Sequence, residues 1–213
     1  MAKTLTGPVL LPQNEAIDKA LIFLHGYGSN GDDLISLAPE FQSKHTGYFS
    51  PHAPSPTVMG MGYEWFSDNN QTFIDKSGME KTLILLEDYL ADIHEKYNVP
   101  YNKMVLVGFS QGTMMSLYAA PRLQHKIAGV IGFSGRLMWQ EELEGTSYHK
   151  TPIILIHGEA DDVVPVKDSP QAAEKLTKLG FDVEVHTIPY LPHGIDGKAI
   201  GFAKAWLKKI LAE

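Results

Sequence analysis

Short apolar runs alternate along the chain with amphipathic segments, and this alternation predicts the fold class. Four of the runs are nearly all apolar, as is typical of strands covered by helices on both faces. The predicted strands are Ala20–Leu24, Gly47–Ser50, Met104–Gly108, Ile127–Phe133, Ile153–His157 and Val183–Ile188. The region before Ala20 is expected to add an antiparallel strand or two.

Segments with helical spacing lie between these runs. The clearest is Met79–Tyr97, with Ser77 and Glu80 as a predicted capping box at its start. Another helix is predicted from about Pro170, with Ser169 as its N-cap. Further helices are predicted at Asp33–Gln42, Gln111–Pro121 and Lys198–Leu211. Alternation of this kind predicts one α/β domain over residues 1–213, with a mainly parallel sheet and helices on both faces.

Two stretches, Pro51–Phe73 and Gly135–Thr151, show the pattern of neither a strand nor a helix. Each follows a predicted strand, and long loops in a compact domain are usually functional or disordered. In open α/β sheets, ligands bind beyond the carboxyl ends of the strands. We therefore expect both stretches to border the functional site.

Composition narrows the functional classes. The 213 residues carry a formal charge of −7, which argues against binding to nucleic acid or to an anionic membrane. The chain has no cysteine, so disulfides, thiolate metal sites and a cysteine nucleophile are excluded. The first residues do not form a signal peptide, and no apolar stretch approaches the ~20 residues of a membrane span. A soluble, cytoplasmic protein without stable membrane insertion is expected.

The segment Gly108–Gly112 (Gly-Phe-Ser-Gln-Gly) has the pattern of a nucleophile turn. It follows a predicted strand and precedes a predicted helix, the context in which a sharp turn lifts a serine oxygen above the sheet. The flanking glycines allow the crowded backbone. The sequence therefore predicts Ser110 as a nucleophile; otherwise the serine merely caps a helix in a glycine-rich turn.

The acid and the base of a triad should follow the serine in that order. Asp161 and Asp162 come just after the strand Ile153–His157, at the rim where Ser110 is expected. Three downstream histidines compete as the base. His149 lies in an irregular stretch, and His186 is expected to face solvent. His193 lies between the last strand and the last helix, which makes it the predicted base.

The segment His25–Gly31 follows the first buried strand and can be interpreted in two ways. In a hydrolase it would bring the backbone N–H of Tyr27 to a developing oxyanion, with the N–H of Gln111 as the second donor. The same residues also spell Gly-x-Gly-x-x-Gly, the dinucleotide fingerprint. No acidic residue closes the next strand to hold a ribose, and Asp32 and Asp33 would repel a pyrophosphate. The hydrolase interpretation is favoured.

Histidines at the strand ends raise the question of a metal site. His25, His52, His157 and His193 could approach one another, but no pair with metal-ligand spacing is present. Structural hydrogen bonding is the more usual role of such residues. Neither a metal nor another cofactor is predicted.

Taken together, these motifs resemble the carboxylesterase, phospholipase and acyl-protein thioesterase family of small α/β-hydrolases. The resemblance runs nearly end to end, through His25–Gly28, Tyr63–Phe66, Gly108–Gly112, His157–Pro165 and His193-Gly194. It implies the α/β-hydrolase fold without a large lid domain and a triad of Ser110, Asp161 (rather than Asp162) and His193. It also implies oxyanion donors at Tyr27 and Gln111, and an aromatic Trp65 near the acyl site. Pro192 departs from the family pattern, in which glycine commonly precedes the histidine.

The expected activity is hydrolysis of carboxylic esters with short-to-medium acyl groups, with a small-molecule ester or thioester as partner. Residues of the two irregular stretches are expected to line an apolar acyl pocket: Met59, Met61, Trp65, Met138 and Trp139. The alternatives are an acyl-protein thioesterase, a lysophospholipase, or a non-catalytic hydrolase fold used for binding. The protein is expected to be a monomer or a homodimer.

Overall fold

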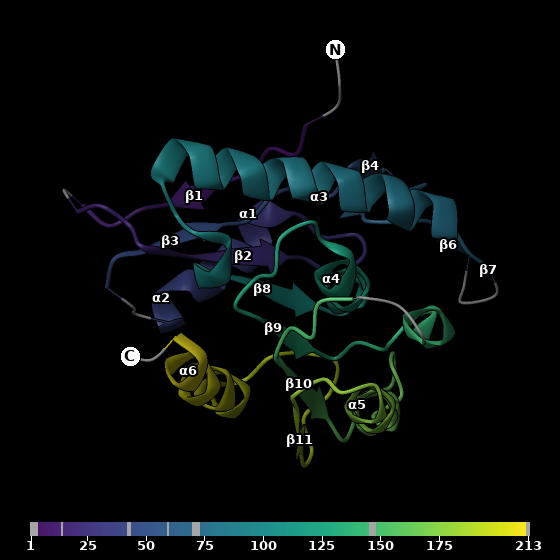
Figure 1. Cartoon of the computed structure of the whole chain (residues 1–213). Coiled ribbons are helices and arrows are strands. Elements are labelled where there is room, and N and C mark those ends of the chain that lie inside the picture. Colours follow the sequence, from purple (N-terminus) through teal and green to yellow (C-terminus); the bar gives the residue numbers. More distant parts are fainter. Residues whose placement is uncertain are drawn as a thin grey trace.

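A seven-stranded sheet forms the centre of the molecule in the computed structural model (Figure 1). The structure describes residues 4–13, 15–41, 44–58, 60–69, 73–144 and 148–211. The strand order is β1-β3-β2-β8-β9-β10-β11, and only β1 runs antiparallel to its neighbour. The strands are β1 (Val9–Leu10), β2 (Lys19–Leu24), β3 (Thr46–Phe49), β8 (Met104–Phe109), β9 (Gly129–Phe133), β10 (Ile153–Gly158) and β11 (Val183–Ile188).

Helices cover both faces of this sheet, as the apolar runs require. The helices α3 (Lys76–Tyr97), α4 (Gln111–Arg122) and α5 (Asp168–Lys178) pack on one face. The other face is covered by α6 (Gly197–Leu211) together with α1 (Gly31–Leu34), the 3₁₀ turn η1 (Ile35–Leu37) and α2 (Ala38–Phe41). Alternate residues of β2 divide between the two cores: Ile22 and Leu24 face α3 and α4, while Leu21 and Phe23 face α6.

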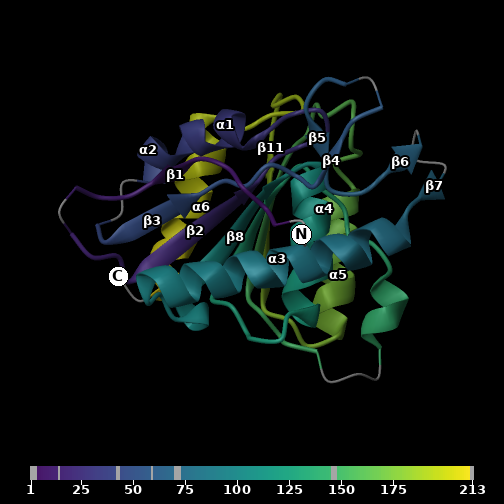
Figure 2. The same cartoon turned by 90° about the horizontal axis from the view of Figure 1, so that it is seen from above.

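The two irregular stretches contain only short elements. The first holds β4 (Ser55–Pro56) paired with β5 (Tyr63–Glu64), and β6 (Asp68–Asn69) paired with β7 (Phe73–Ile74). The second holds the 3₁₀ turn η3 (Gln140–Leu143), and a further 3₁₀ turn, η2 (Tyr101–Lys103), leads into β8. Figure 2 shows β4 and β5 at the end of the molecule where α4 begins. The first stretch is therefore placed to border the nucleophile turn.

Most predicted elements are confirmed, and the differences concern helix ends. The helix predicted from Met79 already begins at Lys76 with Asp75 as its N-cap, so Ser77 lies inside it and the predicted capping box is wrong. The helix predicted from Asp33 is three short pieces. Ser169 lies within α5 and does not cap it, since its hydroxyl oxygen lies 2.7 Å from Nδ1 of His157.

Candidate active site

Ser110 occupies a sharp turn between β8 and α4. Its φ of 52° and ψ of −114° lie outside the regions that L-residues usually adopt, which typically costs about 1–3 kcal/mol. Its N–H donates to the carbonyl of Phe133 on the neighbouring strand, at 2.9 Å. A strained residue fixed from both sides indicates that the fold maintains this conformation for a purpose other than stability.

The glycine at position 112 is required by a close backbone approach. A Cβ at this residue would lie 1.8 Å from the carbonyl oxygen of Leu24 at the end of β2. Only glycine therefore allows the start of α4 to pass the end of β2. Since α4 begins at Gln111, the first N–H groups of the helix point toward this end of the sheet without intrahelical partners.

Asp161 follows β10, and its side chain is wholly buried. Its Oδ1 accepts hydrogen bonds from the N–H groups of Val163 (3.0 Å) and Val164 (2.8 Å). Its Oδ2 accepts from Nδ1–H of His193 at 2.8 Å. Burial by itself would raise the pKa of this carboxyl, but the bonds from His193, Val164 and Val163 outweigh burial and hold the pKa below 3.8. The group is thus a buried carboxylate, whereas the neighbouring Asp162 is exposed.

His193 lies in the loop between β11 and α6, and this loop has to fold back toward the nucleophile. Three strand spacings separate β8 from β11, a distance of about 14 Å. The return is fixed by Leu191, whose carbonyl accepts from the N–H of Ala160 at 3.0 Å. The imidazole of His193 reaches the ring of Phe109, with a centroid distance of 4.9 Å. The structure therefore brings His193 to Asp161 and to the residue next to Ser110.

The turn that contains Tyr27 also lies beside the serine. Leu24 of β2 pairs with Gly108 of β8, so the residues that follow these two strands emerge side by side. A Cβ on Gly26 would lie 3.5 Å from the Cβ of Ser110. Tyr63 holds this turn in place, since it accepts from the N–H of Gly28 (3.0 Å) and donates to the carbonyl of Ser29 (2.8 Å). Both predicted oxyanion donors thus belong to segments next to Ser110.

His25 anchors the same turn. Its Nδ1–H donates to the carbonyl of Gly26 at 2.8 Å, and its Nε2 accepts from the N–H of Ala53 at 3.0 Å. Burial lowers the pKa of this imidazole, which favours the neutral ring that these two bonds require. His25 therefore has a structural role and is not placed as a base or a metal ligand.

The side chain of Gln111 clamps the first irregular stretch against the nucleophile turn. Its Oε1 accepts from the N–H of Trp65 at 2.8 Å, and its Nε2 donates to the carbonyl of Phe66 at 2.9 Å. The indole N–H of Trp65 donates to the carbonyl of His25 at 2.8 Å, and Thr82 of α3 donates to the carbonyl of Trp65. Sequence reasoning used only the backbone of Gln111, because no local pattern predicts a contact over 46 residues.

The residues predicted to line an acyl pocket have different surroundings. Trp65 is 1% exposed and, with Ile84 and Leu85 of α3, lines a hollow of about 390 Å³. Met61 is exposed. Met138 and Trp139 are half-buried, and Trp139 packs edge-on to the ring of Tyr118. Met59 lies outside the described residues.

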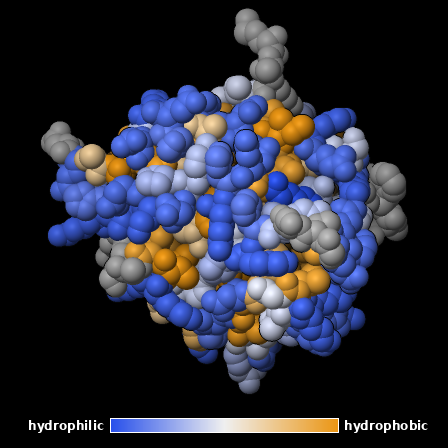
Figure 3. All heavy atoms as spheres, in the orientation of Figure 1, coloured by the Kyte–Doolittle hydropathy of each residue, from blue (hydrophilic) through white to orange (hydrophobic). Residues whose placement is uncertain are grey.

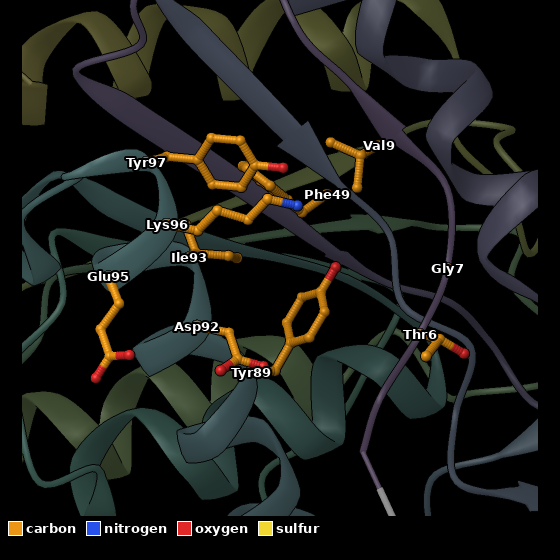
Figure 4. Close-up of a pocket in the computed structure, with 10 residues that line it drawn as sticks. All are labelled: Thr6, Gly7, Val9, Phe49, Tyr89, Asp92, Ile93, Glu95, Lys96 and Tyr97. Atoms are coloured by element: carbon orange, nitrogen blue, oxygen red, sulfur yellow. The ribbon is translucent and has the colours of Figure 1, made fainter.

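A second hollow, of about 520 Å³, lies between the C-terminal half of α3 and the edge formed by β1 and β3 (Figure 4). Phe49 and Ile93 contribute apolar surface, and the side chains of Tyr89 and Lys96 point into it. Burial raises the pKa of Tyr89. None of the catalytic or oxyanion candidates lines either hollow. On the face shown in Figure 3, apolar surface occurs as separate patches between polar residues.

The rival interpretations find little support. Asn30 caps α1, which has only four residues, and the hydroxyl of Ser29 donates to the carboxylate of Asp33 at 2.7 Å. A dinucleotide site would need a longer helix at this position. Within the described ranges, no three histidine, cysteine or acidic residues are grouped so that they could hold a metal ion, and no helix is both long and apolar enough to span a bilayer.

The structure corrects one histidine assignment. His186 was expected to face solvent, but its ring stacks on Phe202 of α6 with a centroid distance of 3.9 Å. Its Nε2 also lies 2.7 Å from Oε1 of Glu184. The alternation along β11 correctly predicts the face of the strand on which His186 lies. It does not predict that α6 partly covers this face. His149 packs near the carbonyl of Gln124, away from the triad candidates.

Comparisons with known proteins identify the family and the fold. A phospholipase/carboxylesterase family model matches residues 6–211. Acyl-protein thioesterase 1 of Candida albicans is 29% identical, with 95% of this chain and 97% of the relative aligned. The crystal structure of esterase PE8 is 36% identical and superposes with a TM-score of 0.91, over 97% of this chain and 99% of that one.

More distant structures share the fold. The carboxylesterase of Bacillus cereus is 18% identical and has a TM-score of 0.79, over 95% of this chain and 93% of that chain. The expected α/β-hydrolase fold, a mainly parallel sheet with helices on both faces, is confirmed.

Proposed function

Because the chain belongs to the phospholipase/carboxylesterase family of α/β-hydrolases, we propose that it hydrolyses carboxylic esters of short-to-medium acyl chain length through a Ser110–His193–Asp161 triad. The observation that carries the proposal is the bond between His193 Nδ1 and the buried Oδ2 of Asp161, at 2.8 Å, beside a strained serine turn. A carboxylate in this position fixes the tautomer whose Nε2 can accept a proton.

The proposed reaction has two halves. Ser110 Oγ attacks the acyl carbonyl while Nε2 of His193 takes its proton, and Asp161 stabilises the imidazolium that forms. The backbone N–H groups of Tyr27 and Gln111 donate to the oxyanion of the tetrahedral intermediate. His193 then protonates the leaving alcohol. Water, activated by the same imidazole, attacks the acyl-enzyme and releases the carboxylic acid and free Ser110.

The preference for short-to-medium acyl groups rests on the size of the available space. Within the residues that the structure describes, no large lid domain is inserted. The hollow lined by Trp65, whose N–H donates to Gln111 of the nucleophile turn, measures about 390 Å³. Apolar residues such as Phe66 and Leu85 form part of its wall, which suits an alkyl chain. A long acyl chain would have to leave part of its apolar surface in water.

A series of p-nitrophenyl esters from acetate to palmitate tests this preference. We expect kcat/KM to be highest between C2 and about C8 and to fall for longer chains, because further methylene groups find no pocket. Rates should be measured below the critical micelle concentration, with a Ser110→Ala variant as the blank. A rate that increases continuously up to palmitate would contradict the proposed preference.

Thioester hydrolysis is the second candidate, and it is favoured by the acyl-protein thioesterase relatives. The same triad attacks a thioester carbonyl and releases a thiol. Matched oxygen and sulfur esters of one acyl group separate the two activities. A kcat/KM at least about tenfold higher for the thioester, beyond the difference in their alkaline hydrolysis, would assign the protein as a thioesterase.

A further inference from the structure

A second imidazole contacts the proposed catalytic carboxylate. His157 is the penultimate residue of β10 and is 0% exposed. Its Nε2 lies 3.2 Å from Oδ2 of Asp161, the same oxygen that accepts from His193. Its Nδ1 lies 2.7 Å from the hydroxyl of Ser169 on α5. Two histidines thus meet at one carboxylate oxygen, one from the strand and one from the returning loop.

The surroundings of His157 determine which of its nitrogens carries a proton. Nε2 faces the carboxylate of Asp161 and, at 3.0 Å, the carbonyl oxygen of Val164, and both of these groups can only accept. Nε2 must therefore be the donor. In the neutral ring Nδ1 is then an acceptor for the hydroxyl of Ser169, whose oxygen also lies 3.4 Å from the carbonyl oxygen of Gly135. The two acceptors at Nε2 fix the tautomer that carries the proton there.

His157 helps to hold the turn that carries the Asp161 carboxylate. Its Nε2–H donates to the carbonyl of Val164, and the N–H of Val164 donates in turn to Oδ1 of Asp161. The same nitrogen lies 3.2 Å from Oδ2, which places the N–H dipole beside the oxygen that accepts from His193. A buried carboxylate that loses such neighbours is costly, and it can turn or admit water. The ring of His157 therefore fixes the Val164 turn and the carboxylate together.

We propose that His157 is a positioning residue of the triad: through the bond of its Nε2–H to the Val164 carbonyl and its contact with Oδ2, it holds the Asp161 carboxylate in the orientation that His193 requires. This inference rests on the proposed function and extends it to a fourth side chain. His157 touches neither the substrate nor Ser110 in this role. It acts through Asp161, so its loss should lower kcat and leave KM nearly unchanged.

Two conservative substitutions separate the two hydrogen bonds of the ring. In His157→Gln, the amide nitrogen lies as many bonds from the backbone as Nε2 does, so a donor to the Val164 carbonyl beside Asp161 is kept. In His157→Asn, the shorter side chain can accept from Ser169 at the place of Nδ1 but has no group that reaches Val164 or Asp161. Both variants are polar and uncharged, and both leave a small defect in the same buried site.

The test is the kinetics of both variants with one short-chain p-nitrophenyl ester, alongside their thermal unfolding. We expect His157→Asn to lower kcat by about 10- to 100-fold, because a small misplacement of the triad has effects of this size. His157→Gln should remain within about threefold of the wild type, and KM should change by less than about threefold in both. Equal kcat losses in the two variants, or an unchanged kcat in His157→Asn, would overturn the role.

A second measurement covers the case in which His157→Asn does not fold. Nuclear magnetic resonance of ¹⁵N-histidine-labelled wild-type protein should show the His157 ring protonated at Nε2, with a resonance that shifts in Asp161→Asn. A bare Nε2 would contradict the inference. A wild type that hydrolyses no ester or thioester would instead refute the proposed function, while the protonation state of His157 could still be measured.

Discussion

Replacing Ser110 with alanine is expected to lower kcat for a p-nitrophenyl ester by at least about 10⁴-fold. The hydroxyl is the only group in the proposed mechanism that forms a covalent bond with the substrate, and the oxyanion donors alone leave a small residual rate. Initial rates of purified protein give the measurement. A loss of less than tenfold would show that another group performs the attack.

Two controls belong to the Ser110→Ala experiment. Ser36→Ala removes an exposed serine hydroxyl that donates to the carbonyl of Asp33, and it should keep the wild-type rate. The thermal midpoint of Ser110→Ala should stay close to that of the wild type. A rate loss with preserved stability then reports on chemistry and not on folding.

Asp161→Asn is expected to reduce kcat by about 10⁴-fold while the protein stays folded at neutral pH. The amide would turn its N–H₂ group either toward the two imidazole nitrogens or toward the N–H groups of Val163 and Val164. In both cases donors face donors. The first orientation also favours the wrong tautomer of His193, because Nδ1 must then accept, whereas the second sets the amide N–H₂ against two backbone N–H groups. Asp162→Asn is the matched control, because its side chain is exposed and its rate should not change.

The difference in stability between the wild type and Asp161→Asn is expected to depend on pH. The hydrogen bonds from His193, Val164 and Val163 hold the pKa of Asp161 below its ordinary value in the folded state, so the folded protein favours the ionised carboxyl. Its contribution to the free energy of unfolding is therefore fully present above about pH 4 and is lost as the pH falls through the lower, folded-state value. Urea unfolding should show the wild type more stable than Asp161→Asn at pH 7, with the difference shrinking below pH 4. A difference that grows on acidification would contradict the assigned pKa direction.

The fold could be predicted largely from residue patterns, because a parallel sheet buried on both faces leaves a clear signal. Runs such as Ile153–Ile156 are apolar without interruption, and this one lies within the observed strand β10. Helix starts were harder to predict. Serine is a residue type that often caps helices, which made Ser169 the predicted N-cap. Its hydroxyl is instead hydrogen-bonded to His157, and this tertiary contact competes with capping.

Some features of the candidate site could likewise be predicted from the sequence, and others could not. The order of Ser110, Asp161 and His193 along the chain, and their places after strands, could be predicted because parallel strands end at one rim. The choice between Asp161 and Asp162 came from family resemblance, and in the structure it corresponds to the difference between a buried and an exposed side chain. The contacts of Trp65 and of the Gln111 side chain could not be predicted, since they join residues far apart in sequence.

The central claim is that Ser110 is activated by His193 at the rim of the sheet, and covalent labelling tests it most directly. The wild type should be treated with a fluorophosphonate, digested, and analysed by mass spectrometry. The account predicts one modified residue, Ser110, and a labelling rate at least about 10²-fold lower in His193→Ala. An adduct at any other residue, or equal labelling of Ser110 in His193→Ala, would contradict it.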